Sequence, residues 1–192
     1  MAAVIEPYTP LILASASPRR VQLLTQLGIT PDAIIPADID ETPHNGELPQ
    51  AYVTRIAQNK AIKVAASNLG QTILSADTIV ALGRRILPKA EDEATARTCL
   101  SLLSGRRHRV MTCVCVISAD GTMRSKTATT MVRFSNLSKR TIDAYIACDE
   151  WRGKAGGYAI QGVASTFIPF ISGSHSNVVG LPLFETAQLL RQ

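Results

Sequence analysis

Short apolar runs alternate with amphipathic stretches along most of this chain. Leu11 to Ala14 is a continuous apolar run, which is typical of a buried strand. The polar loop Ser15 to Ser17 follows, and apolar residues then recur at helical spacing until Gly28 ends the pattern. Pro18 suits the first position of this helix, with Ser17 as its N-cap. The chain therefore opens as strand, tight loop and helix, a layout that points backbone N–H groups at a phosphate.

The remaining pattern predicts an α/β fold, because strands and helices alternate. We expect further strands over residues 33–36, 72–82, 108–118, 122–135 and 166–171, with the second of these broken at 75–78. We expect further helices over residues 50–68, 91–103, 138–147 and 181–190, with Ser138 as a cap. Residues 38–49 are polar and rich in turn formers, which predicts a loop. Asp120-Gly121 indicates a hairpin between two long strands, so the sheet should be mixed.

The composition is that of one globular domain. The chain has 192 residues, of which 46% are hydrophobic and 18% charged. No apolar run approaches the ~18 residues that span a membrane. The first ten residues lack a basic segment and contain Glu6, so we expect no signal peptide and a cytoplasmic location. In that compartment, the four cysteines should be free thiols.

The formal net charge of +5 fits either a nucleic-acid binder or an enzyme for polyphosphate substrates. Aromatic residues make up only 5% of the chain, and no polybasic block is present. Both features disfavour nucleic-acid binding.

Polar side chains interrupt the apolar pattern at several places. Around the first helix start, two serines and the pair Arg19 and Arg20 could hold phosphate oxygens, although an ordinary capped helix would look the same. Asp77 stands between apolar strand residues, where a charge is costly unless it is paired or bound to a metal. Lys89, twelve residues on, could be a cationic companion. The spacing of the histidines does not indicate a metal site.

Two further clusters carry weaker signals. Asp38 to Glu41 is an acidic segment that alone would usually be just solvated, and Lys60 follows in the next predicted helix. The stretch Lys154 to Gly162 contains glycines that permit a tight backbone near a ligand, but a glycine-rich turn explains them equally well. It does not match a P-loop, and no nucleophile elbow or dinucleotide fingerprint is present.

Taken together, these clusters make the sequence resemble the Maf family of nucleoside triphosphate pyrophosphatases. The matching stretches are LILASASPRR, SADTIVALG, LSGRRHRVMT, KAGGYAIQG and SNVVGLPLFET, which span roughly residues 11–186. The resemblance implies an elongated mixed sheet with flanking helices, related to inosine triphosphate pyrophosphatases. It further implies one domain over residues 1–192, with two lobes around a cleft.

The resemblance also implies roles for individual residues. Asp77 corresponds to the catalytic base. The positions that hold the triphosphate and a metal are Ser15, Arg20, Glu41, Lys60 and Lys89. The positions linked to base specificity are Arg19, Thr78 and Gln161, and their identities look like the dTTP/UTP branch. A side-chain amide such as Gln161 can accept from the imide of a pyrimidine and donate to its carbonyl.

The chain departs from the family pattern in two places. Pro88-Lys89-Ala90 stands where the family has Gly-Lys-Pro. Glu150 to Gly156 lacks the acidic residue that usually precedes the lysine here at 154, so any salt bridge or metal contact from that residue is absent.

The expected reaction is attack of water at the α-phosphorus with pyrophosphate leaving. Magnesium, or manganese in its place, would bridge phosphate oxygens to Asp77 and Glu41. Asp77 could be the base or a metal ligand, and the sequence leaves both roles open. Rival hypotheses are a nucleotide-binding regulator of cell division, or a pyrophosphatase for 7-methylguanosine triphosphate or a deaminated purine nucleotide. A homodimer is compatible with the sequence.

Overall fold

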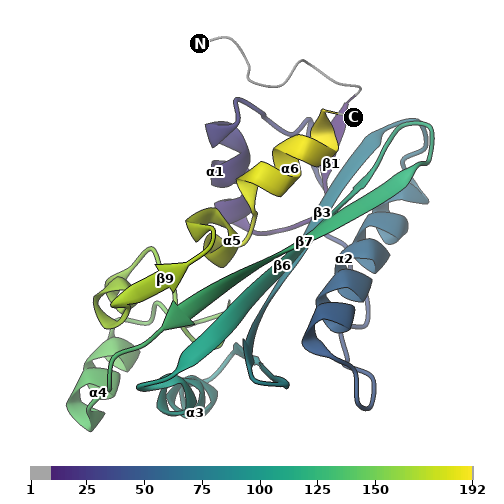
Figure 1. Ribbon diagram of the computed structural model, residues 1–192. Coiled ribbons are helices and arrows are strands. Elements are labelled where there is room, and N and C mark those ends of the chain that lie inside the picture. Colours follow the sequence, from purple (N-terminus) through teal and green to yellow (C-terminus); the bar gives the residue numbers. More distant parts are fainter. Residues whose placement is uncertain (1–9, 192) are drawn as a thin grey trace. The chain divides into compact units, whose positions relative to one another are not determined.

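A computed structural model describes residues 10–191 and divides them into two compact units (Figure 1). Unit 1 contains residues 10–77, 112–128 and 180–191, and unit 2 contains residues 78–111 and 129–179. The long strands contribute residues to both units; they are β3 (Thr72–Leu82), β6 (Arg107–Ile117) and β7 (Met123–Arg133). The expectation that the N-terminus carries no signal peptide falls mostly outside the described residues.

The sheet of unit 1 has the strand order β2-β1-β3-β6-β7. β1 (Leu11–Leu13) lies between β2 (Ala33–Ile34) and β3 and is parallel to both. All residues of β1 are buried, which is typical of a strand covered on both faces of a parallel sheet.

The helices of unit 1 cover both faces of this sheet; they are α1 (Pro18–Gln26), α2 (Pro49–Ala65) and α6 (Leu183–Leu190) (Figure 1). Side chains alternate between the two faces along β7. Ser125 bonds Gln58 of α2, whereas the next residue, Lys126, bonds Gln188 of α6. α2 and α6 therefore lie on opposite faces.

In unit 2, the strand order is β4-β3-β6-β7-β9. β4 (Arg85–Leu87) is antiparallel to β3, and β9 (Phe170–Ser172) is antiparallel to β7. β5 (Lys89–Ala90) and β8 (Lys154–Ala155) form a separate antiparallel pair. The helical elements are α3 (Glu93–Leu103), α4 (Lys139–Ala147), α5 (His175–Val179) and a 3₁₀ helix (Val163–Phe167).

The core of unit 2 is built around aromatic side chains. Phe134 packs edge-to-face against Tyr158 and Phe167, with ring centroids 4.9 and 6.1 Å apart. Trp151 is 1% exposed and donates its indole N–H to the carbonyl of Ile146 at the end of α4. Such buried rings stabilise a small core strongly because each removes a large apolar area from water. This core fixes the segment that leads to Gln161.

The predicted α/β class and the mixed sheet with flanking helices are confirmed. The hairpin at Asp120-Gly121 is confirmed as well, since the amide of Gly121 bonds the carbonyl of Ser118 and β6 and β7 are neighbours. Ser138 caps α4 by accepting from the amide of Thr141. Among residues 10–191, no helix has the length and apolarity needed to cross a membrane.

Two local predictions are wrong. β3 runs unbroken through residues 75–78, because Ser75 donates to the carbonyl of Ala57 and Asp77 pairs with a lysine, so neither polar side chain forces a break. Residues 166–171 are not one strand: a 3₁₀ helix ends at Phe167 and β9 begins at Phe170. The prediction of Ser17 as the N-cap residue of α1 is confirmed, although its side chain makes no capping bond.

The short elements escaped prediction. β4, β5, β8 and α5 have two to five residues each, too few for a period to be visible in the sequence. The last helix begins at Leu183 rather than Leu181.

Candidate functional site

Two carboxylates of unit 1 converge on one lysine. The Nζ atom of Lys60 lies 2.7 Å from Oε1 of Glu41 and 2.7 Å from Oδ1 of Asp77. Lys60 and Asp77 are 8% and 3% exposed, while the side chain of Glu41 is 33% exposed. A buried carboxylate is stable only with such a partner, so the pairing explains how Asp77 can lie in an apolar strand.

The local sequence dictates this convergence. Ser75 and Asp77 are two residues apart on β3 and therefore face the same side, which is the side covered by α2. Ile56, Ala57 and Ala61 of α2 are buried against the sheet. Lys60 lies on the same side of the helix and is itself buried, with its ammonium group at Asp77.

The loop between β1 and α1 places a second group of polar atoms in unit 1. Ser15 is 7% exposed, and its Oγ accepts from the amide of Ser17 at 3.3 Å and from Nη1 of Arg20 at 2.7 Å. Nε of Arg20 donates to the carbonyl of Gly180 at 2.9 Å. The guanidinium is thus fixed from two directions.

Electrostatics links this arginine to the carboxylates. Burial lowers the pKa of Arg20, and the negative charge of Asp77 is the largest influence that opposes this, with a smaller one from Glu41. Burial also lowers the pKa of Arg19. The structure therefore brings Ser15, Arg20, Glu41, Lys60 and Asp77 into one polar cluster within unit 1, which we call the carboxylate–lysine cluster.

The remaining predicted residues belong to unit 2. Thr78 follows Asp77 on β3 and is half-buried. Lys89 is exposed on β5, where it pairs with Ala155 of β8. Despite the departure from Gly-Lys-Pro, Pro88 contributes its carbonyl to this pairing by accepting from the amide of Gly156 at 3.0 Å. The β5–β8 pair thus sets the backbone position of Lys89.

Gly156 is therefore a sensitive position. Its φ of +67° disfavours any side chain, and an added Cβ would lie 2.9 Å from Cβ of Val80. Gly153 has a similar φ of +63°, but nothing lies within 4 Å of its added Cβ. We expect Gly153→Ala to lose about 1 kcal/mol of unfolding free energy, from backbone strain alone. Gly156→Ala should lose at least about 2 kcal/mol, because overpacking adds to the strain. Urea unfolding measures both, and equal losses would contradict the role given to Val80.

Gln161 lies in a loop that is held by neighbouring side chains. The hydroxyl of Tyr145 accepts from the amide of Ala159 at 3.1 Å, and Oε2 of Glu150 accepts from the amide of Val163 at 2.8 Å. The turn itself is closed by the backbone, from the amide of Gly162 to the carbonyl of Ala159. The side chain of Gln161 is exposed. The loop is thus fixed without any hydrogen bond from Gln161.

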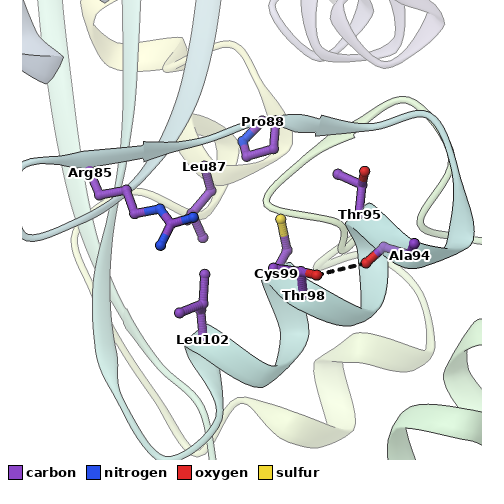
Figure 2. Close-up of a pocket in the computed structure, with 8 residues that line it drawn as sticks. All are labelled: Arg85, Leu87, Pro88, Ala94, Thr95, Thr98, Cys99 and Leu102. Carbon is purple, nitrogen blue, oxygen red and sulfur yellow. Dashed lines mark hydrogen bonds between the residues drawn. The ribbon is translucent and has the colours of Figure 1, made fainter.

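Unit 2 also contains a cavity of about 270 Å³ between β4 and α3 (Figure 2). Its lining residues are Arg85, Leu87, Pro88, Ala94, Thr95, Thr98, Cys99 and Leu102. Burial raises the pKa of the Cys99 thiol, so this sulfur behaves as an apolar wall atom. None of the predicted site residues lines the cavity, which borders Lys89 only through Pro88.

The donor set of the carboxylate–lysine cluster suits a divalent cation that also binds substrate. Within residues 10–191, no group of three or more His, Cys, Asp or Glu side chains could hold a metal ion alone. Magnesium commonly uses one or two protein carboxylates and completes its shell with phosphate oxygens and water. Glu41 and Asp77 already share one cation, the ammonium of Lys60, so the two carboxylates fit such an ion.

Sequence reasoning missed Tyr52 and Arg55. The hydroxyl of Tyr52 donates to the carbonyl of Glu41 at 2.8 Å, and Arg55 holds Glu47 and the carbonyl of Thr42. Both side chains project from α2 onto the loop that carries Glu41. The apolar residues of α2 predict its helical period but not the roles of these two side chains. The signal in the sequence that points to Arg55 is an acidic residue in the preceding loop, Glu47, with which it can pair.

Comparison with known proteins shows the family of this chain. The family model described as Maf-like protein matches residues 10–192. The chain belongs to the Maf family. A protein of Rhodospirillum rubrum named dTTP/UTP pyrophosphatase is 58% identical over 181 residues, which cover 94% of this chain and 86% of the relative. A protein of the same name from Paramagnetospirillum magneticum is 59% identical over 180 residues, covering 94% and 95% of the two chains.

A solved structure has a fold similar to that of this Maf protein. A HAM1 protein from Coxiella burnetii matches with a TM-score of 0.53 and 15% sequence identity, covering 94% of this chain and 97% of that one. At this identity the likeness supports the α/β architecture alone.

Proposed function

We propose that this Maf protein hydrolyses dTTP and UTP to the nucleoside monophosphate and pyrophosphate. The observation that carries the proposal is the buried Asp77, held by Lys60 beside Glu41 and linked electrostatically to Arg20. The relatives from Rhodospirillum rubrum and Paramagnetospirillum magneticum, which carry the name dTTP/UTP pyrophosphatase, support the same substrates.

The residues of the carboxylate–lysine cluster have separate tasks in this proposal. Arg20 and Ser15 bind phosphate oxygens, since a guanidinium fixed from two directions is pre-organised for them. Asp77 orients the attacking water or accepts its proton. As the water oxygen bonds to the α-phosphorus, the bond to the β-phosphate oxygen breaks and pyrophosphate leaves. Lys60, and Lys89 from unit 2, balance negative charge on the phosphates.

Glu41 and Asp77 would hold a magnesium or manganese ion together with the triphosphate. Such an ion neutralises phosphate charge and makes bound water more acidic. We further propose that residues 1–192 act as one domain with two lobes. The cleft, the cytoplasmic location and a homodimer stay predictions.

One experiment tests the function directly. The purified protein is incubated with dTTP, UTP, CTP and 7-methylguanosine triphosphate in the presence of Mg²⁺, and the products are separated by ion-exchange chromatography. We expect dTMP and UMP with pyrophosphate. Nucleoside diphosphates with orthophosphate would mean cleavage at the γ-phosphorus, and unchanged nucleotides would contradict an enzymatic function.

The base is proposed to be read by Arg19, Thr78 and Gln161. If the amide of Gln161 bonds the pyrimidine imide, Gln161→Glu places a carboxylate oxygen against a carbonyl oxygen. A mismatch of this kind costs roughly 1–3 kcal/mol, so kcat/KM for dTTP and UTP should fall ~10–100-fold. Activity on the cationic 7-methylguanine nucleotide should fall less.

Ser165→Glu is the matched control for the added charge, because Ser165 is exposed in the 3₁₀ helix that follows the same loop. It should leave the ratio of the specificity constants unchanged. Equal losses on all the nucleotides in the Gln161→Glu variant would show that Gln161 does not read the base.

A further inference from the structure

The loop over residues 35–48, which carries Glu41, has no helix or strand of its own. An irregular loop that must be ordered when ligand binds would lose conformational entropy at that moment and weaken binding. The position of the Glu41 carboxylate therefore depends on what holds the loop beforehand.

Two side chains of α2 hold consecutive carbonyl groups of this loop. The hydroxyl of Tyr52 donates to the carbonyl of Glu41 at 2.8 Å, and Nη2 of Arg55 donates to the carbonyl of Thr42 at 3.2 Å. The peptide groups that follow Glu41 and Thr42 are thus fixed from the helix. Lys60 of the same helix holds the side chain of Glu41.

Arg55 is itself fixed by a carboxylate at the far end of the loop. Its Nε and Nη2 atoms lie 2.7 Å from the two carboxylate oxygens of Glu47, which gives a bidentate pair. The hydrogen bonds from Arg55 lower the pKa of Glu47 to about 2, so the pair stays charged at any working pH. Oε2 of Glu47 also accepts from the amide of His44 at 3.0 Å.

Tyr52 is itself held in place against the loop. Its side chain is buried, and its hydroxyl donates to the carbonyl of Glu41. The guanidinium of Arg55 lies over its ring, 5.5 Å from the centroid. The two side chains therefore support each other as one clamp, which we call the Tyr52–Arg55 clamp.

We propose that the Tyr52–Arg55 clamp is a positioning device that pre-orders Glu41 for the divalent cation that the triphosphate brings. The inference rests on the proposed function for its ligand, but the clamp itself is a property of unit 1 alone. Neither residue touches the substrate in this proposal. Loosening the clamp therefore weakens binding of the cation. It leaves the rate of the chemical step nearly unchanged once the cation is saturating.

Tyr52→Phe removes only the hydroxyl, and Thr54→Val is its matched control. Thr54 lies on the same helix, and its hydroxyl bonds Thr127 of β7 at 3.2 Å rather than the loop. Both variants lose one side-chain hydrogen bond of α2. We expect Tyr52→Phe to raise the Mg²⁺ concentration that gives half-maximal turnover about fivefold, because one lost hydrogen bond weakens binding by about that factor. The kcat at saturating Mg²⁺ should change less than twofold. Thr54→Val should leave both quantities unchanged.

Amide hydrogen exchange without metal or nucleotide gives an independent readout. The amides of Thr42, His44 and Glu47 donate hydrogen bonds within the loop and should report its order. Their exchange should accelerate about fivefold in Tyr52→Phe and not in Thr54→Val. Arg55→Gln should accelerate the exchange of these amides at least as strongly. Arg55→Lys keeps the positive charge but loses the bidentate guanidinium, so these amides should be only partly protected in this variant.

Two results would overturn the proposal. One is unchanged exchange of these three amides in Tyr52→Phe and Arg55→Gln, which would show that the clamp does not order the loop. The other is a fall in kcat at saturating Mg²⁺ with an unchanged half-maximal concentration, which would give Tyr52 a role in the chemical step. If the wild-type protein cleaves no nucleotide, the proposed function fails separately, and the exchange measurement still decides whether the clamp exists.

Discussion

Asp77→Asn should slow the release of pyrophosphate from dTTP at least ~100-fold, the usual scale for a lost acid–base or electrostatic group. The substitution keeps the size of the side chain and one oxygen that Lys60 can bond, but removes the charge. Of its two charged partners among residues 10–191, Lys60 would then keep Glu41 alone, whose side chain is 33% exposed. Both ways in which Asp77 could act, as base or as metal ligand, require the negative charge.

A control separates this effect from a general loss of charge in unit 1. Asp120 lies in the exposed hairpin turn, where its Oδ1 accepts from the amide of Thr122, and asparagine can make the same bond. Asp120→Asn should therefore retain full activity. The circular dichroism spectrum of Asp77→Asn should match that of the wild type. Retention of more than half the wild-type rate would show that Asp77 is not catalytic.

The same variant also distinguishes the two roles of Asp77. If the carboxylate is mainly a metal ligand, Asp77→Asn should raise the Mg²⁺ requirement, and part of the rate should return at high Mg²⁺. If it is mainly the base, the loss should persist at every Mg²⁺ concentration.

The sequence predicted those strands, helices and site residues whose structure is determined by a pattern within a few residues. The run Leu11 to Ala14 and the helix after Pro18 gave β1 and α1, because burial and helix-start signals act within a few residues. An acidic residue in an apolar strand identified Asp77, because such a charge needs a partner. The partner itself, Lys60, is 17 residues away in the chain, and only the family resemblance associated the two.

What the sequence could not predict depends on contacts between distant residues. The expected break in β3 followed from reading Ser75 to Thr78 as an interruption, whereas in the structure α2 supplies partners for Ser75 and Asp77. The anchoring of the Gln161 loop depends on Glu150, which bonds the amide of Val163. The role of Arg55 depends on a loop carboxylate eight residues earlier. Polar contacts between distant residues produce no periodic pattern in the sequence from which they could be predicted.

The division between the units falls between Asp77 and Thr78, consecutive residues of β3. In our proposal the first of them acts on the phosphates and the second contacts the base.

Removing divalent cations should abolish hydrolysis of dTTP, with a loss of at least ~100-fold. The cations that the structure describes in the candidate site of unit 1 are Arg19, Arg20 and Lys60, and the carboxylates of Glu41 and Asp77 offset two of these three charges. Even with the one further positive charge of Lys89, which our proposal adds from unit 2, these cations cannot balance a triphosphate, and the carboxylates would repel its oxygens unless a cation lies between them. The measurement is dTMP formation, followed directly by chromatography, in excess EDTA and again after Mg²⁺ or Mn²⁺ is added beyond the chelator. Recovery by either ion is expected, because both prefer oxygen ligands. Ionic strength is held constant across the series, so that screening of the arginines does not mimic the effect. A rate in EDTA equal to that with Mg²⁺ would mean that the protein's own side chains neutralise the triphosphate, and Glu41 would then have no role as a metal ligand.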